Sequence, residues 1–318
     1  MRTRASFVLD FVMAVAAVIC GGFIFGCSQK ATEAEPQTAV APAVAYVGQW
    51  GVKGDGPGHL QEPASIAADV LGNAYIADAG SEFIHKFDPQ GTPLLSFQED
   101  PLKHPQWIAV DPDGDVYVTD PVRGSVFVFY PGGEKDIHRE LHLRTRPGKE
   151  GFVSVAVGSD ELIHVLDSKS GKVDTYTPRF RFLRSWIPPS NEPSSGTHPG
   201  PIAMGPDGFL YIADERGSRI MRFTGEGQFV SEINTSASGV GKLSAQFTVS
   251  RTCIFAMGSD GRMLHVWTID GKPKLDVDLA PQLGQGARPA PGLAMSPRDE
   301  LLVLDQPGGR VLRYRVNF

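Results

Sequence analysis

Two histidines and one glutamate occupy the same place in three related segments of the chain. Glu62, His104 and His198 each stand four residues before an apolar triplet that begins Ile-Ala. Two histidines and a carboxylate can hold a divalent metal ion and leave coordination positions open. If the three segments surround one axis, this pattern predicts a metal site on that axis, with zinc or calcium as the candidate ion.

The same pattern has a plainer interpretation. Both histidines precede a proline, and a His-Pro pair suits a loop that leads into a strand. At the equivalent place, two further segments have Gly151 and Pro289, so a third histidine ligand is missing. The residues alone leave both the metal site and the loop interpretation open.

Basic residues form a second group in a chain that is acidic overall, with a formal net charge of −6. Its members are Arg139, Arg144, Arg146, Arg179, Arg181 and Arg184. Residues 179–182 alternate Arg and Phe, which predicts an outer strand with its arginines on one face. Such a face is either simply solvated or a binding patch for acidic partners or anionic lipid headgroups.

The candidate metal ligands and the basic residues both lie within an internal repeat. Segments such as 63–78, 105–120 and 199–214 share an apolar run, a turn rich in Gly and Asp, and a second apolar run that ends in Asp. The unit recurs roughly every 45 residues, which is typical of the four-stranded blades of a β-propeller. The fifth copy, at 246–258, diverges most.

We therefore expect an all-β fold, a six-bladed β-propeller with four antiparallel strands in each blade. The first two strands of each unit are continuous apolar runs, which predicts burial, whereas the outer two alternate and should keep one face wet. The last unit stops after its third strand, at Phe318. Residues 44–50 have the pattern of the missing fourth strand, so we expect them to join the last blade and close the ring.

The repeated motif resembles the NHL repeat. The pattern P-x-x-I-A-x-D-x-x-G-x-x-Y-I-A-D, followed by G-S-x-x-I and an aromatic residue, covers nearly all of 44–318. The resemblance implies a propeller that binds its ligands at the mouth of a central channel. NHL-like propellers include the peptidyl-hydroxyglycine amidating lyase, which uses channel histidines for zinc. That likeness makes His104 and His198 candidate ligands, with Glu62 as a ligand or a base.

The repeated aspartates at the strand ends have a structural interpretation. They are Asp78, Asp120, Asp167, Asp214 and Asp305. An Asp before a tight turn can accept hydrogen bonds from the turn amides. In the fourth and sixth units Arg219 and Arg310 open the next strand, which predicts local ion pairs. Residues 111–115, DPDGD, resemble part of a calcium loop but lack its closing glutamate, so we interpret them as a turn.

The N-terminal residues have the pattern of a targeting segment. Residues 1–27 place two arginines before an apolar run that ends in Ile-Phe-Gly-Cys, which resembles a bacterial lipobox with Cys27 as the lipid attachment site. The alternative is an uncleaved membrane anchor. Residues 28–43 predict a flexible tether to the propeller at 44–318. We expect this propeller to be exported and membrane-anchored, facing the periplasm or the cell exterior.

The composition limits the classes of partner that we expect this chain to bind. The acidic balance and the export signal argue against nucleic acid. Of three cysteines only Cys253 lies in the propeller, and we expect it to be a buried apolar residue. We expect a membrane-tethered binding module for a protein, peptide or glycan. The alternative is a metal-dependent lyase or hydrolase with its site at the channel mouth, and the sequence leaves open which of the two it is.

Overall fold

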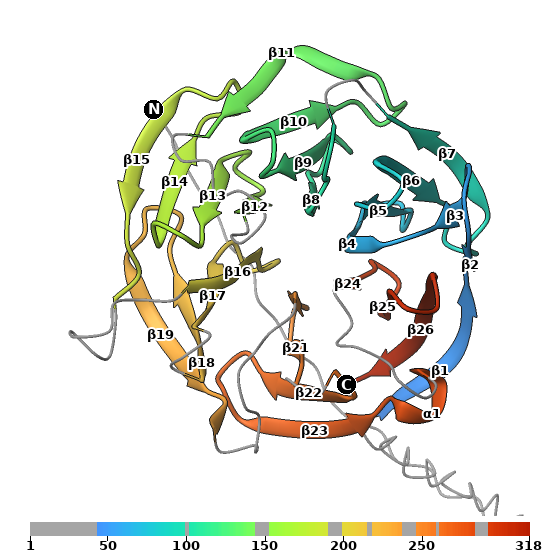
Figure 1. Ribbon diagram of the computed structural model, residues 1–318. Coiled ribbons are helices and arrows are strands. Elements are labelled where there is room, and N and C mark those ends of the chain that lie inside the picture. The colour runs from blue at the N-terminus through green and yellow to red at the C-terminus, as the bar shows by residue number, and fades with distance from the viewer. Residues whose placement is uncertain are drawn as a thin grey trace, which may run out of the picture. The chain divides into compact units, whose positions relative to one another are not determined.

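Six four-stranded sheets stand around one central channel in the computed structural model of the chain (Figure 1). The structure describes residues 43–98, 102–143, 153–189, 199–214, 218–236, 246–258, 261–283 and 292–318. This arrangement confirms the all-β, six-bladed propeller. The signal segment at 1–27, with Cys27, and nearly all of the tether at 28–43 lie outside the described residues.

The strands of the first three blades run in chain order from the channel outward. Blade 1 consists of β4 (Pro63–Ala68), β5 (Ala74–Asp78), β6 (Phe83–Phe87) and β7 (Pro93–Phe97). Blade 2 consists of β8 (Trp107–Val110), β9 (Val116–Asp120), β10 (Ser125–Phe129) and β11 (Lys135–His142). Blade 3 consists of β12 (Val153–Val157), β13 (Ile163–Asp167), β14 (Lys172–Tyr176) and β15 (Phe182–Trp186).

The next two blades repeat this order, and the sixth departs from it. Blade 4 consists of β16 (Pro199–Met204), β17 (Leu210–Asp214), β18 (Arg219–Phe223) and β19 (Phe229–Asn234). Blade 5 consists of β20 (Phe247–Val249), β21 (Cys253–Met257), β22 (Met263–Thr268) and β23 (Pro273–Asp278). Blade 6 consists of β24 (Leu293–Met295), β25 (Glu300–Asp305), β26 (Arg310–Asn317) and, as its outer strand, β1 (Ala43–Trp50).

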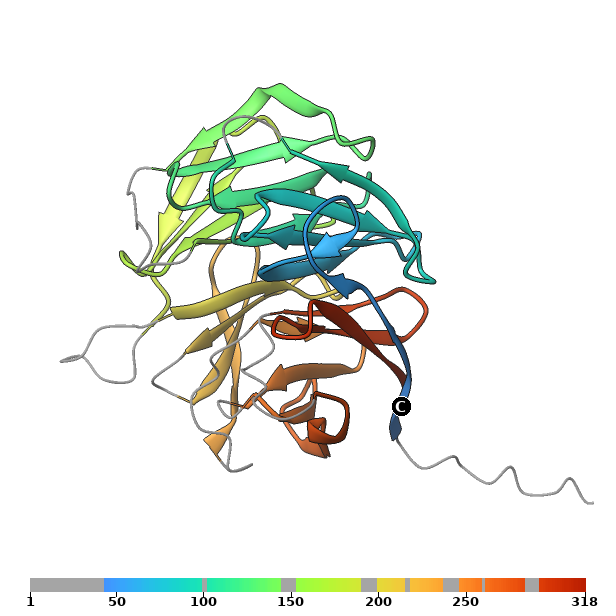
Figure 2. The ribbon, with the colours of Figure 1, turned by 45° about the vertical axis from the view of Figure 1, so that its right-hand side comes forward.

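The ring is closed by the first and last strands of the propeller. β1 pairs antiparallel with β26, from Ala43 opposite Asn317 to Trp50 opposite Val311. Both ribbon views show the blue first strand along the red last strand (Figures 1 and 2). The pairing confirms the expected role of residues 44–50 and covers an edge that would otherwise expose unpaired backbone groups.

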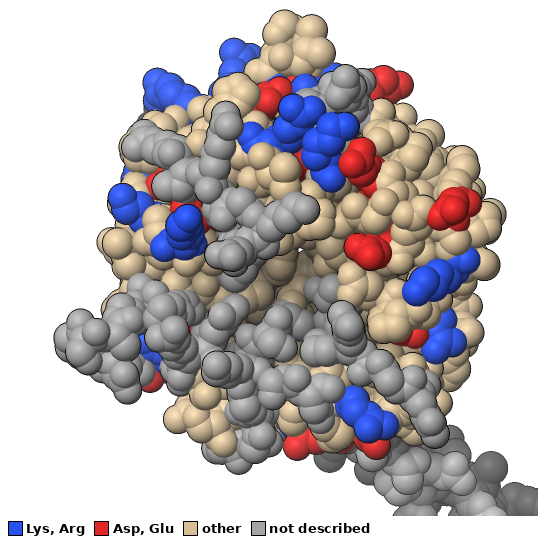
Figure 3. Space-filling model, in the orientation of Figure 1, with Lys and Arg blue, Asp and Glu red and all other residues tan. Residues whose placement is uncertain are grey.

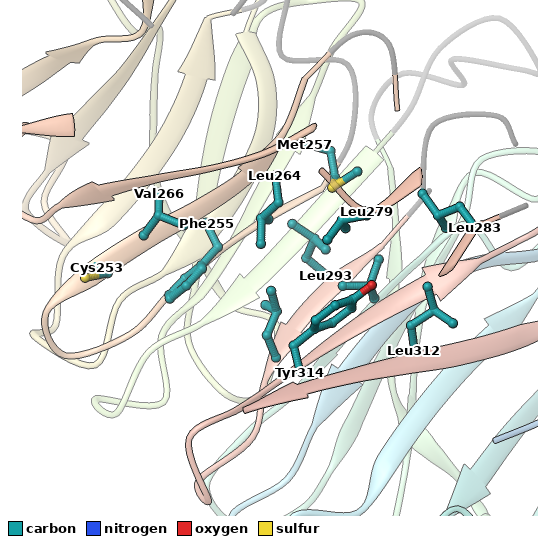
Figure 4. Packing of buried hydrophobic residues seen from close by; sticks show 12 residues of the cluster. Cys253, Phe255, Met257, Leu264, Val266, Leu279, Leu283, Leu293, Leu312 and Tyr314 are labelled. Carbon is teal, nitrogen blue, oxygen red and sulfur yellow. The ribbon is translucent and has the colours of Figure 1, made fainter. Parts of the chain in front are cut away.

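Apolar side chains fill the space between neighbouring blades. Figure 4 shows the cluster shared by blades 5 and 6, in which Cys253, Phe255 and Tyr314 lie among leucines. Cys253 is fully buried, as expected. Side chains of a strand alternate between its two faces, so one blade contributes to the clusters on both of its sides.

The expectation of a wet face on the third strands is wrong for blades 2 and 4, whereas β14 of blade 3 keeps it, with Lys172 exposed and Asp174 half-buried. All five residues of β10 are buried, as are four of five in β18. Neighbouring blades still cover both faces of the sheet at this radius. Exposure is concentrated in the fourth strands, where Phe229 and Val230 of β19 are 50% and 42% exposed.

Two small elements complete the described chain. β2 (Val52–Lys53) and β3 (His59–Leu60) form a parallel pair before blade 1, and α1 (Ala280–Leu283) follows β23. No helix in the part of the chain that the structure describes is long and apolar enough to cross a membrane.

Candidate functional site

The channel has two ends, which differ in the chain segments that form them. At the entry end, the chain enters each innermost strand through loops such as 61–62 and 103–104. At the turn end, each innermost strand turns back into the second strand, as at 69–72 and 111–114. The metal prediction lies at the entry end.

Buried strand-end aspartates hold the entry loops of blades 1 and 2. The Asp78 carboxylate accepts the N–H groups of Gln61 at 2.7 Å and Glu62 at 2.8 Å. In blade 2, Asp120 accepts the N–H groups of Lys103 at 2.6 Å and His104 at 3.0 Å. The structural interpretation of these aspartates is therefore confirmed.

The same aspartates also bind the turns that follow their own strands. Asp78 accepts the N–H of Gly80 at 3.0 Å, and Asp120 accepts those of Val122 and Arg123, both at 3.0 Å. In blades 4 and 6 the expected ion pairs form, with Arg219 Nε 3.1 Å from Asp214 and Arg310 Nε 2.7 Å from Asp305. Each carboxylate thus ties several parts of its blade together.

The ionisation of Asp78 fits this role. Burial alone raises the pKa of its carboxyl, but the His85 ring and the amides of Gln61, Glu62 and Gly80 outweigh burial and leave the pKa below its usual value. His85 Nε2 lies 3.7 Å from the carboxylate, and both side chains are fully buried. A charged carboxylate is therefore held in place by its donors.

Glu62 and His104 lie at equivalent positions, as the sequence alignment predicted. Each has its N–H on the strand-end aspartate of its own blade, with Glu62 exposed and His104 half-buried. His198, the third residue of the prediction, lies outside the described residues. Within the described part of the chain, no three His, Cys, Asp or Glu side chains are grouped as metal ligands would be. The metal site stays a prediction.

A side chain from blade 5 crosses in front of blade 6 to reach blade 1 near the entry end of the channel. Gln246 Nε2 donates to the carbonyl oxygen of Ile66 in blade 1 at 3.2 Å, and Gln246 Oε1 accepts from the Ser65 hydroxyl at 3.2 Å. Ser65 also accepts the N–H of Ile108 in blade 2 at 3.3 Å. A Cβ at Gly292 of blade 6 would stand 2.9 Å from Gln246 Oε1, so glycine leaves room for the crossing. These bonds narrow the channel beneath the entry loops.

The turn end opens into a cavity of about 450 Å³ that residues of all six blades line. A ring of small and apolar residues separates it from a channel volume of about 210 Å³: Ala68, Val110, Val157, Met204, Val249 and Met295. Four charged residues line the cavity: Asp69, Asp111, Arg251 and Asp299.

Two of these charges belong to the scaffold. Asp69 accepts the N–H groups of Leu71 and Asn73 and the Tyr75 hydroxyl. Asp111 accepts the N–H groups of residues 113 and 115 and, at 3.2 Å, the Tyr117 hydroxyl. The DPDGD segment is thus the expected turn, with its first carboxylate occupied by turn donors.

Blade 3 breaks this tyrosine pattern. His164 stands opposite Ala156, as Tyr75 stands opposite Ala67 in blade 1. It is fully buried, its Nδ1 lies 3.1 Å from the Thr175 hydroxyl, and its Nε2 has no hydrogen-bond partner. Burial lowers the pKa of His164 to about 4, so the ring is neutral at pH 7. The structure confirms the expected hydrogen-bonded core histidine.

Arg139 of the basic group is engaged within blade 2. Its guanidinium donates to Asp136 at 2.6 Å, to Asp115, and to the Tyr117 hydroxyl at 3.3 Å. These partners raise the pKa of Arg139 despite its partial burial. Arg139 therefore supports the blade, and Arg144 and Arg146 lie outside the described residues.

The predicted arginine face at 179–182 is wrong in its geometry. β15 begins only at Phe182, and residues 177–181 form the hairpin turn that precedes it, closed by the Thr177 N–H on the Arg181 carbonyl at 3.0 Å. Phe180 has a positive φ of 54° and packs its ring 6.4 Å from that of Tyr117. Arg179 and Arg181 are exposed in this turn, and Arg184 lies on β15. Figure 3 shows basic and acidic side chains interspersed on the described part of one face.

Comparison with known proteins identifies the fold. No protein-family model matches the chain, and no curated protein matches its sequence. A streptogramin B lyase structure matches with 13% identity and a TM-score of 0.61, over 87% of this chain and 97% of the lyase. A catalytically inactive virginiamycin B lyase from Staphylococcus aureus, solved with quinupristin, matches with 14% identity and a TM-score of 0.58, over 87% of this chain and 99% of the lyase. A Bacteroides thetaiotaomicron protein of unknown function matches with 14% identity and a TM-score of 0.61, over 87% and 76% of the two chains. At these identities the likeness shows the propeller fold alone.

Proposed function

We propose that this chain is an NHL-type propeller, exported and held at a membrane by its N-terminal segment, that binds a protein, peptide or glycan at the entry end of its channel. The observation that carries the proposal is the way the entry loops are held. Asp78 and Asp120 fix the backbone of Glu62 and His104, so that side chains which differ from blade to blade stand on a rigid frame. A preorganised frame lowers the entropy cost of binding a partner.

The Gln246 crossing adds support. Because it narrows the channel below the entry loops, a partner at this end meets the described entry-loop side chains above a constricted channel. Such a surface favours recognition of an outer feature of a large molecule over passage of a small one. The exposed Arg179 and Arg181 lie in the turn between β14 and β15, at the turn end of the channel, and are not part of this surface.

Site-specific photo-cross-linking in the cells that make the protein tests this proposal. A benzophenone side chain replaces Glu62 or His104 in the full chain. The matched control replaces Leu94, which is 52% exposed on the outer strand of blade 1. We expect discrete adducts from positions 62 and 104 and none from 94. No adduct at 62 or 104, or the same adducts at all three positions, would overturn the proposal.

A metal-dependent lyase or hydrolase is the second candidate. It is favoured by the equivalent placement of Glu62 and His104 and by the lyases among the similar folds. The third ligand would be His198, and the ion zinc or calcium. Metal content of the purified full chain tests it, beside a His104→Ala/His198→Ala variant. A near-stoichiometric metal that only this variant loses supports the enzyme, with His138→Ala, an exposed histidine on β11, as the control. A metal-free wild type after incubation with both ions rejects it.

A further inference from the structure

The turn-end cavity combines an open volume, an apolar wall and charged side chains that have no partner among the described residues. It has a volume of about 450 Å³ and continues past its apolar ring into the channel. Met204 and Met295 are the longest side chains of that ring, and methionine adapts its shape to varied apolar groups. The cavity can therefore take an apolar side chain of several carbons.

The rim of the cavity is also apolar on one side. Val70 and Leu71, in the turn between β4 and β5, are 62% and 70% exposed. The corresponding turn of blade 2 has Pro112 and Asp113 there, and that of blade 4 has Pro206 and Asp207. An exposed apolar pair beside an open cavity is typical of a contact surface.

Some of the charged side chains that line the cavity already have hydrogen-bond partners, and others have none among the described residues. Asp69 and Asp111 are occupied by their turns and by tyrosine hydroxyls. Arg251, in the turn between β20 and β21, is exposed and has no hydrogen-bond or ion-pair partner among the described residues. Asp299, in the turn between β24 and β25, lines the same cavity and likewise leaves its carboxylate available in the described structure.

The innermost strands supply backbone groups to the same space. The N–H of Ile108 and the carbonyl of Ile66 point into the channel, where they meet side chains of other strands. In an antiparallel pair the residues that point away from the partner strand alternate. Ala68 and Val110, two positions further on, therefore turn their N–H and C=O groups toward the channel beside the cavity. A strand edge of this kind pairs readily with an extended peptide.

We propose that the turn-end cavity is a second binding site, which takes the free carboxyl terminus of a peptide whose last side chain is apolar. The Arg251 guanidinium donates two hydrogen bonds to the terminal carboxylate. The Asp299 carboxylate accepts a peptide N–H, and the last side chain packs against Met204 and Met295. The site lies at the opposite end of the channel from the partner surface proposed above and does not depend on it.

Fluorescence anisotropy with the purified full chain tests this site. The probe is fluorescein-Gly-Ser-Gly-Leu with a free carboxylate, and its C-terminal amide is the comparison. We expect the wild type to bind the free acid and to bind the amide about tenfold more weakly, because the amide cannot form a charged pair with a guanidinium. The acid should also bind more weakly at high salt.

Two exposed arginines on neighbouring turns form a matched pair of variants. Arg251 lines the cavity, whereas Arg298 does not. Arg251→Gln should weaken binding of the acid about tenfold and abolish the preference over the amide, whereas Arg298→Gln should bind as the wild type does. Because neither the Arg251 nor the Arg298 side chain has a hydrogen-bond or ion-pair partner among the described residues, neither change should alter the thermal unfolding midpoint. Equal binding of acid and amide, an Arg251→Gln variant that binds normally, or no binding of the acid up to about 1 mM would overturn the proposal.

Discussion

At both ends of the channel, aspartates accept hydrogen bonds from the backbone of loops or turns. The two ends differ in which other side chains remain available to a ligand. At the entry end, Asp78 and Asp120 bind the loops that lead into the channel strands. At the turn end, Asp69 and Asp111 bind the turns that leave those strands, together with a tyrosine hydroxyl.

The residues that break the repeat differ between the two ends. The entry end has Glu62, which is exposed, His104, which is half-buried, and the Gln246 crossing, which narrows the channel below them. The turn end has an open cavity with one available guanidinium, Arg251. The comparison teaches that an aspartate which recurs from blade to blade builds the frame. Ligand chemistry is to be sought where one blade differs from the others.

Removing a frame aspartate should have the largest effect. Asp120 is fully buried and accepts four backbone N–H groups. Asp120→Ala leaves these donors without a partner and should lower the free energy of unfolding by about 4 kcal/mol, since each buried unsatisfied group costs about 1–3 kcal/mol. Denaturant unfolding measures the loss. Asp120→Asn keeps one acceptor oxygen and should lose less; equal stability of all three proteins would show that the aspartate is not part of the frame.

The histidine that stands at the tyrosine position of blade 3 should make the stability of the protein depend on pH. His164 has a pKa of about 4 in the fold, against about 6.5 in an unfolded chain, so the unfolded state binds more protons between these values. The contribution of His164 should be constant above about pH 6.5 and should lower the stability by about 3 kcal/mol as the pH drops to about 4. Denaturant midpoints measured across this window test the prediction.

A tyrosine at this position should restore the pattern of blades 1, 2 and 4. Tyr75, Tyr117 and Tyr211 donate their hydroxyls to turn aspartates of their own blades. His164→Tyr should therefore remove most of the pH dependence between 6.5 and 4 described by linkage. If the variant keeps the full acid sensitivity of the wild type, another group causes it.

Breaking the channel crossing should have a smaller effect. Gln246→Ala removes two hydrogen bonds and leaves the Ile66 carbonyl without its side-chain donor, so it should cost about 2 kcal/mol of stability. Thermal or denaturant unfolding measures the cost. Gln246→Glu, which keeps the size but not the donor, separates the hydrogen bond to Ile66 from packing. An unchanged stability in both variants would mean that the crossing does not brace the ring.

The smallest effects should separate the two kinds of arginine in the basic group. Arg139→Ala breaks pairs with Asp115 and Asp136 and should cost about 1.5 kcal/mol, because these pairs are partly buried. Arg184→Ala should cost less than about 0.5 kcal/mol, as is usual for a surface substitution. Equal losses from the two substitutions would contradict the assignment of Arg139 to the frame.

Sequence alone predicted the parts of this molecule that repeat. The ring and the hydrogen-bonding role of the strand-end aspartates follow from local patterns that recur along the chain, and the closure by 44–50 follows from the missing fourth strand of the last copy. The alternation at 179–182 misled because a single left-handed residue, Phe180, turns the chain before the strand begins.

The remaining features depend on long-range geometry. Gln246 meets Ser65 across 181 residues of sequence, and Arg251 is notable only because no neighbour in the described structure pairs with it. Their one sequence signal is that both stand in or next to the fifth copy, which diverges most from the repeat.

The effect of metal ions on the stability of the wild type and of the Asp78→Ala variant tests the account most directly. A ligand that binds only the native state raises its stability in proportion to the logarithm of ligand concentration. Denaturant curves of the wild type and Asp78→Ala are to be recorded with a chelator, with zinc and with calcium. The account predicts the same loss of about 4 kcal/mol in all three buffers, and no stabilisation of the wild type by either ion. A wild type that zinc or calcium stabilises, with that gain absent in Asp78→Ala, would contradict it and place a metal centre at the entry end.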